Sequence, residues 1–145
     1  MKENMKPKIH VLLFALVFTA SAQAQINNAT PKTNTSQTET PELVVNLQLE
    51  AYNLRDLDKF VATYSEDIEI YKKGILIIKG HEQLREIYSK MFDNTPNLYC
   101  RIENRILINN KVIDKENVKA NERTLEAVAI YEVINGKIQK VTFVE

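Results

Sequence analysis

Cysteine, glycine and tryptophan are scarce in this sequence. Its 145 residues include one cysteine, three glycines and no tryptophan. A single cysteine, Cys100, excludes an internal disulfide and a CxxC motif, and we expect it to be a small buried residue on a strand. Three glycines leave no phosphate-binding glycine loop, and no Ser/His/Asp series is present. Nucleotide-binding, dithiol redox and serine-hydrolase functions therefore lack their motifs.

An excess of charge is also missing. Lys and Arg number 19, Asp and Glu number 19, and the formal net charge is zero. Without a positive excess, no overall field would attract nucleic acid or an anionic membrane surface. Hydrophobic residues make up 44% and charged residues 26%, which is ordinary for globular proteins. We therefore expect one soluble domain without a nucleic-acid partner.

The longest apolar stretch is too short to span a bilayer. Residues 9–20 are almost all apolar, follow three lysines and precede the small residues of Ser21-Ala22-Gln23-Ala24. A membrane-spanning helix needs about 20 apolar residues. The pattern instead predicts a signal peptide, residues 1–24, and hence export to the periplasm or the medium with no membrane attachment after cleavage. Residues 25–41, rich in Asn, Thr, Gln and Ser, predict a disordered linker.

Residues 42–145 carry the pattern of one folded domain. Helical spacing of apolar residues predicts helices over 42–54, from Leu57 to about Ser65, and over 81–92. Alternation and turn residues predict strands over 68–71 and 75–78, and four longer strands over 98–108, 111–119, 124–134 and 137–145. The order α-α-β-β-α-β-β-β-β predicts an α+β fold, in which three helices cover one face of a curved antiparallel sheet.

Several segments resemble the nuclear transport factor 2-like superfamily, and within it the SnoaL-like and ketosteroid-isomerase-like proteins. These are AYNLRDLDKFVATYSEDIEIY (51–71), KGHEQLREIYSKMF (79–92), RIENRILINNKVIDKENV (101–118) and LEAVAIYEVINGKIQKVTF (125–143). The resemblance implies a cone, the cystatin-like roll, with an apolar cavity at its mouth. It also implies a homodimer formed through the sheet.

At the positions of the isomerase catalytic residues, this sequence has residues of other types. Ketosteroid isomerases use a Tyr and a protonated Asp as donors to an oxyanion, and a second Asp as the base. The matching positions fall near Gln48 for the Tyr, Lys72 for the base and Ile130 for the oxyanion acid. All three are replaced, so any isomerase-like or cyclase-like chemistry would need another carboxylate.

Asp114 and Glu116 are the candidate catalytic residues. They lie two apart on a predicted strand, so both share the face that carries Val112 and Val118. If this face lines the cavity, burial beside a second negative charge raises the pKa of one carboxyl and suits it for acid or base catalysis. If Ile113 faces inward instead, both acids are solvated and pair with lysines across the sheet.

A second group of residues is predicted to line a ligand pocket. Rings on the helical faces would line the interior of a cone, and Asn104 interrupts the apolar face of its strand. Asn104 has two interpretations, because its amide would either orient a ligand carbonyl or satisfy backbone groups at a bend of the sheet. The pocket residues are Tyr52, Phe60, Tyr64, Tyr88, Phe92, Asn104 and Ile106.

Three functions follow from these patterns. The first is an exported domain that binds a small, mostly apolar molecule. The second is a weak isomerase, cyclase or dehydratase that moves a proton with Asp114 or Glu116. The third is a homodimeric interaction module whose cavity is filled by side chains such as Phe60. We expect no cofactor and no metal site, because His81 has no second His at ligand spacing.

Overall fold

A computed structural model describes residues 39–144 of the chain. The predicted signal peptide and most of the predicted linker lie outside these residues. Nine elements follow one another in the order predicted from the sequence. Their bounds are α1 (Pro41–Leu54), α2 (Leu57–Ala62), β1 (Tyr64–Lys72), β2 (Ile75–Lys79), α3 (Gly80–Asn94), β3 (Tyr99–Ile108), β4 (Lys111–Ala120), β5 (Arg123–Ile134) and β6 (Lys137–Val144).

Capping residues define the first two helices. Thr40 precedes Pro41, and its hydroxyl accepts a hydrogen bond from the Leu43 amide. The carboxylate of Asp56 caps α2 by accepting from the Lys59 amide at 3.1 Å. The second helix is shorter than predicted and ends at Ala62. The chain turns into β1 there because Tyr64 pairs with β6, an interaction between distant segments that local periodicity does not report.

The sheet is mixed, whereas the sequence analysis predicted an antiparallel one. Its strand order is β2-β1-β6-β5-β4-β3. All neighbouring pairs are antiparallel except β1 and β6, which are parallel. The apolar pattern of a strand fixes which face is buried but not the direction of a partner that is about 70 residues away. The last strand of the chain therefore lies in the middle of the sheet, beside the first.

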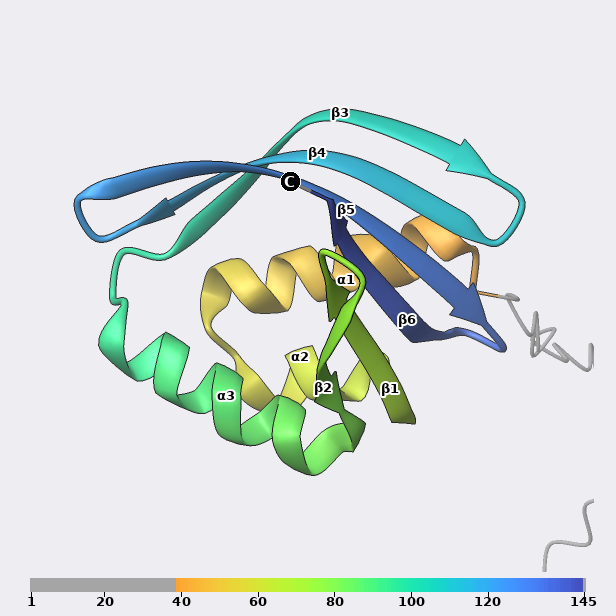
Figure 1. Ribbon diagram of the computed structural model, residues 1–145, viewed down its shortest axis with the longest axis horizontal. Coiled ribbons are helices and arrows are strands. Elements are labelled where there is room, and N and C mark those ends of the chain that lie inside the picture. The colour runs from red at the N-terminus through yellow and green to blue at the C-terminus, as the bar shows by residue number, and fades with distance from the viewer. Residues whose placement is uncertain (1–38, 145) are drawn as a thin grey trace, which may run out of the picture. The chain divides into compact units, whose positions relative to one another are not determined.

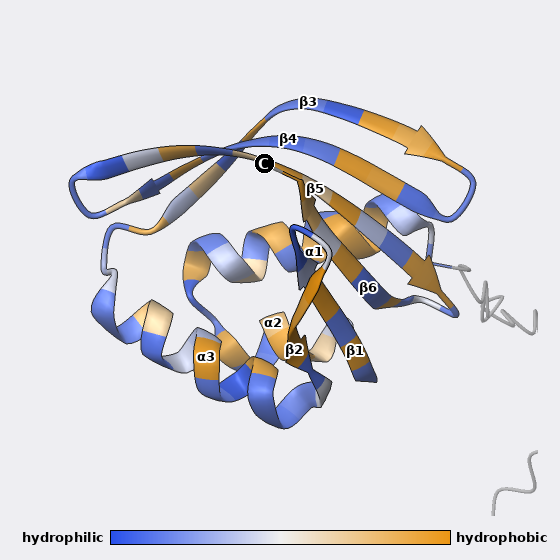
Figure 2. Cartoon of the chain, in the orientation of Figure 1, coloured by the Kyte–Doolittle hydropathy of each residue, from blue (hydrophilic) through white to orange (hydrophobic). Residues whose placement is uncertain are grey.

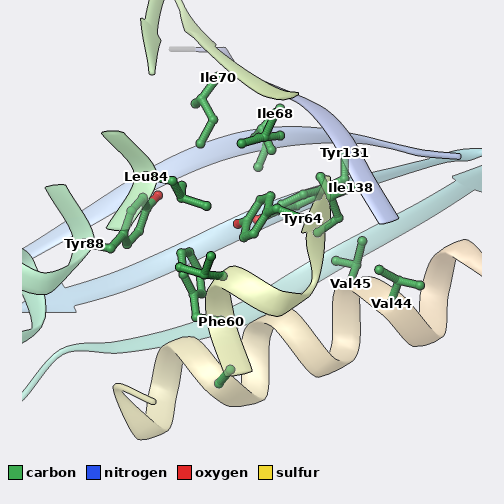
Figure 3. Packing of buried hydrophobic residues seen from close by; sticks show 14 of the residues in the cluster. Val44, Val45, Phe60, Tyr64, Ile68, Ile70, Leu84, Tyr88, Tyr131 and Ile138 are labelled. Atoms are coloured by element: carbon green, nitrogen blue, oxygen red, sulfur yellow. The ribbon is translucent and has the colours of Figure 1, made fainter. Parts of the chain in front are cut away.

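The three helices lie on one side of the curved sheet. Figure 1 shows β3, β4 and β5 bending over α1, while α2 and α3 lie below it beside β1 and β2. The core fills the space between these layers. Phe60 of α2 is fully buried, with its ring centroid 5.0 Å from that of Tyr64 and 4.4 Å from that of Tyr88 (Figure 3).

A register shift in β3 determines which of its residues face the helices. The regular pairing with β4 is interrupted between Ile102 and Asn104, as in a β-bulge. After the bulge, Arg105 lies opposite the buried Asp114, and Asn104 and Ile106 lie on the outer face, where Ile106 is 53% exposed. Figure 2 shows in orange the hydrophobic residues in the second half of β3, after the bulge. Asn104 and Ile106 were predicted to line the pocket, and that placement is wrong because one extra residue reverses the alternation.

Candidate functional site

A cavity of about 710 Å³ lies between the concave face of the sheet and the helices α1 and α3. Most of its wall is apolar, and four strands contribute the aliphatic residues Ile70, Ile78, Val118 and Val141. Six polar residues that the following argument uses also line it: Gln48, Tyr52, Tyr64, Tyr88, Glu116 and Tyr131. The volume is in the range of small-molecule sites, which are mostly apolar with a few placed polar groups.

The predicted pocket residues divide into two layers. Tyr52, Tyr64 and Tyr88 line the cavity. Phe60 and Phe92 do not line it but pack behind these tyrosines, with 5.6 Å between their own ring centroids. The two phenylalanines therefore support the wall and do not plug the cavity.

The inward face of β4 is the one that carries both acids. Val112, Asp114 and Glu116 are all buried, whereas Lys115 between the acids is exposed. Ile113 lies opposite Ile106 of β3 on the outer face. The structure therefore agrees with the interpretation in which Asp114 and Glu116 face the interior, and not with the one in which Ile113 does.

Asp114 is neutralised by an ion pair. Its side chain is 1% exposed, and the Arg105 guanidinium donates to both carboxylate oxygens, from Nε at 2.6 Å and from Nη2 at 2.7 Å. Arg105 also donates to the Asn46 side chain on α1. Asp114 is not among the cavity-lining residues. Its carboxylate holds β3, β4 and α1 together, and both of its oxygens are occupied, so the structure gives no support for the predicted catalytic role.

Glu116 lines the cavity and has no such counter-charge. Within residues 39–144, the hydrogen-bond partner of its carboxyl is the Tyr131 hydroxyl, which donates to Oε1 at 2.7 Å. Burial raises the pKa of Glu116 to about 7, and the negative charge of Asp114 adds to this effect. The hydrogen bond from Tyr131 and the positive charge of Arg105 each lower the pKa of Glu116, but by less than burial raises it. Glu116 can therefore gain or lose a proton near neutral pH.

Four tyrosine hydroxyls accompany Glu116. Burial is the main cause that raises the pKa of Tyr52, Tyr64, Tyr88 and Tyr131, and the charge of Glu116 contributes in each case. All four are protonated at neutral pH, so each can donate a hydrogen bond and accept one. The nearby Cys100 is buried as expected, and burial raises the pKa of its thiol to about 12, so it is no thiolate nucleophile.

Two of the six polar lining residues named above were not predicted as site residues. Gln48 was considered only as a replacement for an isomerase tyrosine, and Tyr131 was not singled out. Ala129, Tyr131 and Val133 form the buried face of β5, so the period-two pattern contained the signal for Tyr131. Ile130, at the position matched to the oxyanion acid, lies on the other face, whereas Lys72, matched to the base, lines the cavity but is exposed.

The part of the chain that the structure describes contains no cluster of three or more His, Cys, Asp or Glu residues suited to a metal ion. Within the same residues, no helix has the length and apolar character needed to cross a membrane.

Comparison with known proteins agrees with this architecture. Residues 45–141 match the model of the SnoaL-like domain. Among solved structures, a cystatin-fold protein from Novosphingobium aromaticivorans is 21% identical, covering 73% of this chain and 98% of its own, with a TM-score of 0.68. A protein from Kribbella flavida that bears the name ketosteroid isomerase is 17% identical, covering 73% and 77%, with a TM-score of 0.65.

A third structure, from Sinorhizobium meliloti, bears the name polyketide cyclase. It is 13% identical, covers 70% of this chain and 93% of its own, and has a TM-score of 0.62. These likenesses show the fold, an α+β cystatin-like or nuclear transport factor 2-like architecture. No curated protein sequence matches the chain. The match over most of the described domain shows that the chain belongs to the SnoaL-like domain family.

The Arg105–Asp114 pair predicts an asymmetric double-mutant cycle. Arg105→Met should lower the free energy of unfolding by about 3 kcal/mol, because it leaves a buried carboxylate without its partner. Arg105→Met combined with Asp114→Leu should recover most of this loss, since both charges are then gone. Urea denaturation of the wild type and the variants measures the effect. A single variant as stable as the wild type would show that the pair does not hold the sheet.

The raised pKa of Glu116 predicts a stability that falls with rising pH. The folded state keeps the proton of Glu116 up to about pH 7, whereas an unfolded glutamate loses it near its ordinary pKa of 4.5. Ionisation of the buried group therefore destabilises the fold as pH rises through this window, by at most about 3 kcal/mol. Glu116→Gln removes the effect, so it should stabilise the protein more at pH 8 than at pH 5. Denaturant unfolding of both proteins at the two pH values tests this, and an equal difference at both would contradict the raised pKa.

Proposed function

We propose that this SnoaL-like domain binds a small, mostly apolar molecule in its cavity. The observation that carries the proposal is a cavity of about 710 Å³ between well-packed layers, with a mostly apolar wall and, among the described residues, one buried acid in its lining. A concave space of this size with a mostly apolar lining is the usual form of a small-molecule site. The Tyr and Glu side chains would orient such a ligand, while the apolar wall would supply the affinity.

Two adjacent residues of β5 allow a matched test of ligand binding. Ala127 lines the cavity, and Val128 points to the other face of the strand. In a fluorescence titration with the neutral apolar probe N-phenyl-1-naphthylamine, Ala127→Trp should bind at least tenfold more weakly than the wild type, because the indole occupies the cavity. Val128→Trp should bind the probe like the wild type. Absence of probe binding to the wild type, or equal binding by both variants, would refute the proposal.

A second candidate function is proton transfer by Glu116, as in an isomerase, cyclase or dehydratase. The specific observation in its favour is a buried carboxyl with a pKa of about 7 next to the protonated Tyr131 hydroxyl. Two structures of similar fold bear the names ketosteroid isomerase and polyketide cyclase. We propose that in such a reaction Glu116 would be the base and Tyr131 the hydrogen-bond donor.

Isomerisation of a β,γ-unsaturated ketosteroid, followed by ultraviolet absorbance of the conjugated product, tests this second function. A Glu116-dependent rate should rise with pH through an apparent pKa near 7 and should be lost in Glu116→Gln. A rate that Glu116→Gln leaves intact would remove Glu116 from the reaction, and no rate with the wild type would remove this class of substrate.

A further inference from the structure

Among the described residues that line the cavity, one buried residue is acidic and none is a buried Lys or Arg. Glu116 is 6% exposed, and among the described residues no Lys or Arg forms an ion pair with its carboxylate. Two further charged residues line the cavity, Lys72 and Glu126, and both are exposed to solvent. A buried charge is normally paired, because the cost of removing it from water is otherwise uncompensated. Once Glu116 is ionised, above about pH 7, the deep part of this site is therefore short of one positive charge.

Arg105, a partly buried cation whose charge acts on Glu116, cannot supply that charge. Both Nε and Nη2 of Arg105 donate to Asp114, and Nη1 donates to Asn46. Moving the guanidinium toward Glu116 would leave Asp114, only 1% exposed, without its partner. Arg105 also does not line the cavity. The pair thus behaves as a neutral unit, and it leaves the negative charge of Glu116 available to a ligand.

The polar atoms around Glu116 are mainly oxygens. The hydroxyls of Tyr52, Tyr64, Tyr88 and Tyr131 lie close enough to Glu116 for its charge to influence each of them. An ionised carboxylate only accepts hydrogen bonds, whereas a hydroxyl can accept as well as donate. A protonated amine has only donors and carries the missing positive charge. A ligand carboxylate would instead face a like charge in a desolvated site.

We infer that the ligand of this cavity is an apolar molecule with a protonated amine, whose nitrogen binds the Glu116 carboxylate and the neighbouring tyrosine hydroxyls. This inference rests on the proposed function and narrows it to one chemical class. The apolar body of the ligand would contact the aliphatic wall formed by residues such as Ile70 and Val141. A charge-assisted bond between ammonium and carboxylate is stronger than a neutral hydrogen bond, and it is strongest where water is excluded.

Three probes with the same body separate the charge requirement from apolar binding. Isothermal titration at pH 8 with 4-phenylbutylamine, 4-phenylbutan-1-ol and 4-phenylbutyrate compares a cation, a neutral molecule and an anion. The wild type should bind the amine at least tenfold more tightly than the alcohol, and the carboxylate most weakly. The Glu116→Gln variant should bind the amine no more tightly than the alcohol. Glu126→Gln, which removes an exposed acid that also lines the cavity, is the matched control and should keep the preference.

The amine preference should also depend on pH. The groups facing Glu116 are the Tyr131 hydroxyl, the Arg105–Asp114 pair, the Cys100 thiol and the hydroxyls of the other three tyrosines. With burial holding the pKa of Glu116 near 7 and raising those of the tyrosines and the thiol, Glu116 is the one expected to titrate between pH 5.5 and pH 8. Amine affinity should fall about tenfold at pH 5.5, whereas alcohol affinity should change little.

The outcomes distinguish this inference from the function on which it rests. If the alcohol binds as tightly as the amine, apolar binding stands and the amine inference is wrong. If none of the three probes binds to the wild type, while N-phenyl-1-naphthylamine also fails to bind, the proposed function is wrong as well. A preference for the amine that survives Glu116→Gln but disappears in Glu126→Gln would place the determinant at the exposed acid and would also overturn the inference.

Discussion

The bidentate ion pair between Arg105 and Asp114 is the interaction on which the site depends. It joins β3 to β4 inside the concave face of the sheet and, through Asn46, connects both strands to α1. It also commits Arg105 to Asp114, so that this guanidinium does not pair with Glu116, two residues along β4. Asp114 is therefore structural, whereas burial, with no cation paired to it among the described residues, raises the pKa of Glu116 to about 7. The same strand thus provides a structural contact and a reactive carboxyl.

The bulge in β3 makes this pairing possible. Without the register shift between Ile102 and Asn104, regular alternation from Cys100 and Ile102 would direct Asn104 and Ile106 inward and Arg105 outward. Asp114 would then be buried without a cation, which is a costly arrangement. Local irregularity in the edge strand therefore determines the electrostatics of the cavity. This is why a substitution or deletion near residue 103 would affect both the fold and the site.

The sequence predicts much of this fold, and the parts it misses share a physical cause. The apolar spacing locates the helices and strands, and the alternation along β4 correctly groups Val112, Asp114 and Glu116 on one face. The bulge, the parallel pairing of β1 with β6 and the partner of Asp114 all depend on which strand lies next to which, and a periodic pattern carries no such information. Tyr131 differs, because the alternation of Ala129, Tyr131 and Val133 along β5 does indicate its buried face, whereas the isomerase positions point to Ile130 on the opposite face.

The chemistry of the cavity wall favours a bound molecule over a merely incomplete core. Five aromatic residues are arranged in two layers, in which Phe60 and Phe92 lie behind Tyr52, Tyr64 and Tyr88, and of the phenylalanines only Phe143 is among the described residues that line the cavity. A core that only needed to be filled would gain more from phenylalanine in both layers, because a buried hydroxyl costs free energy unless it has a partner. The hydroxyls occur instead where they face the open space and the charge of Glu116. Their position has a physical reason if a polar group of a ligand completes their hydrogen bonds.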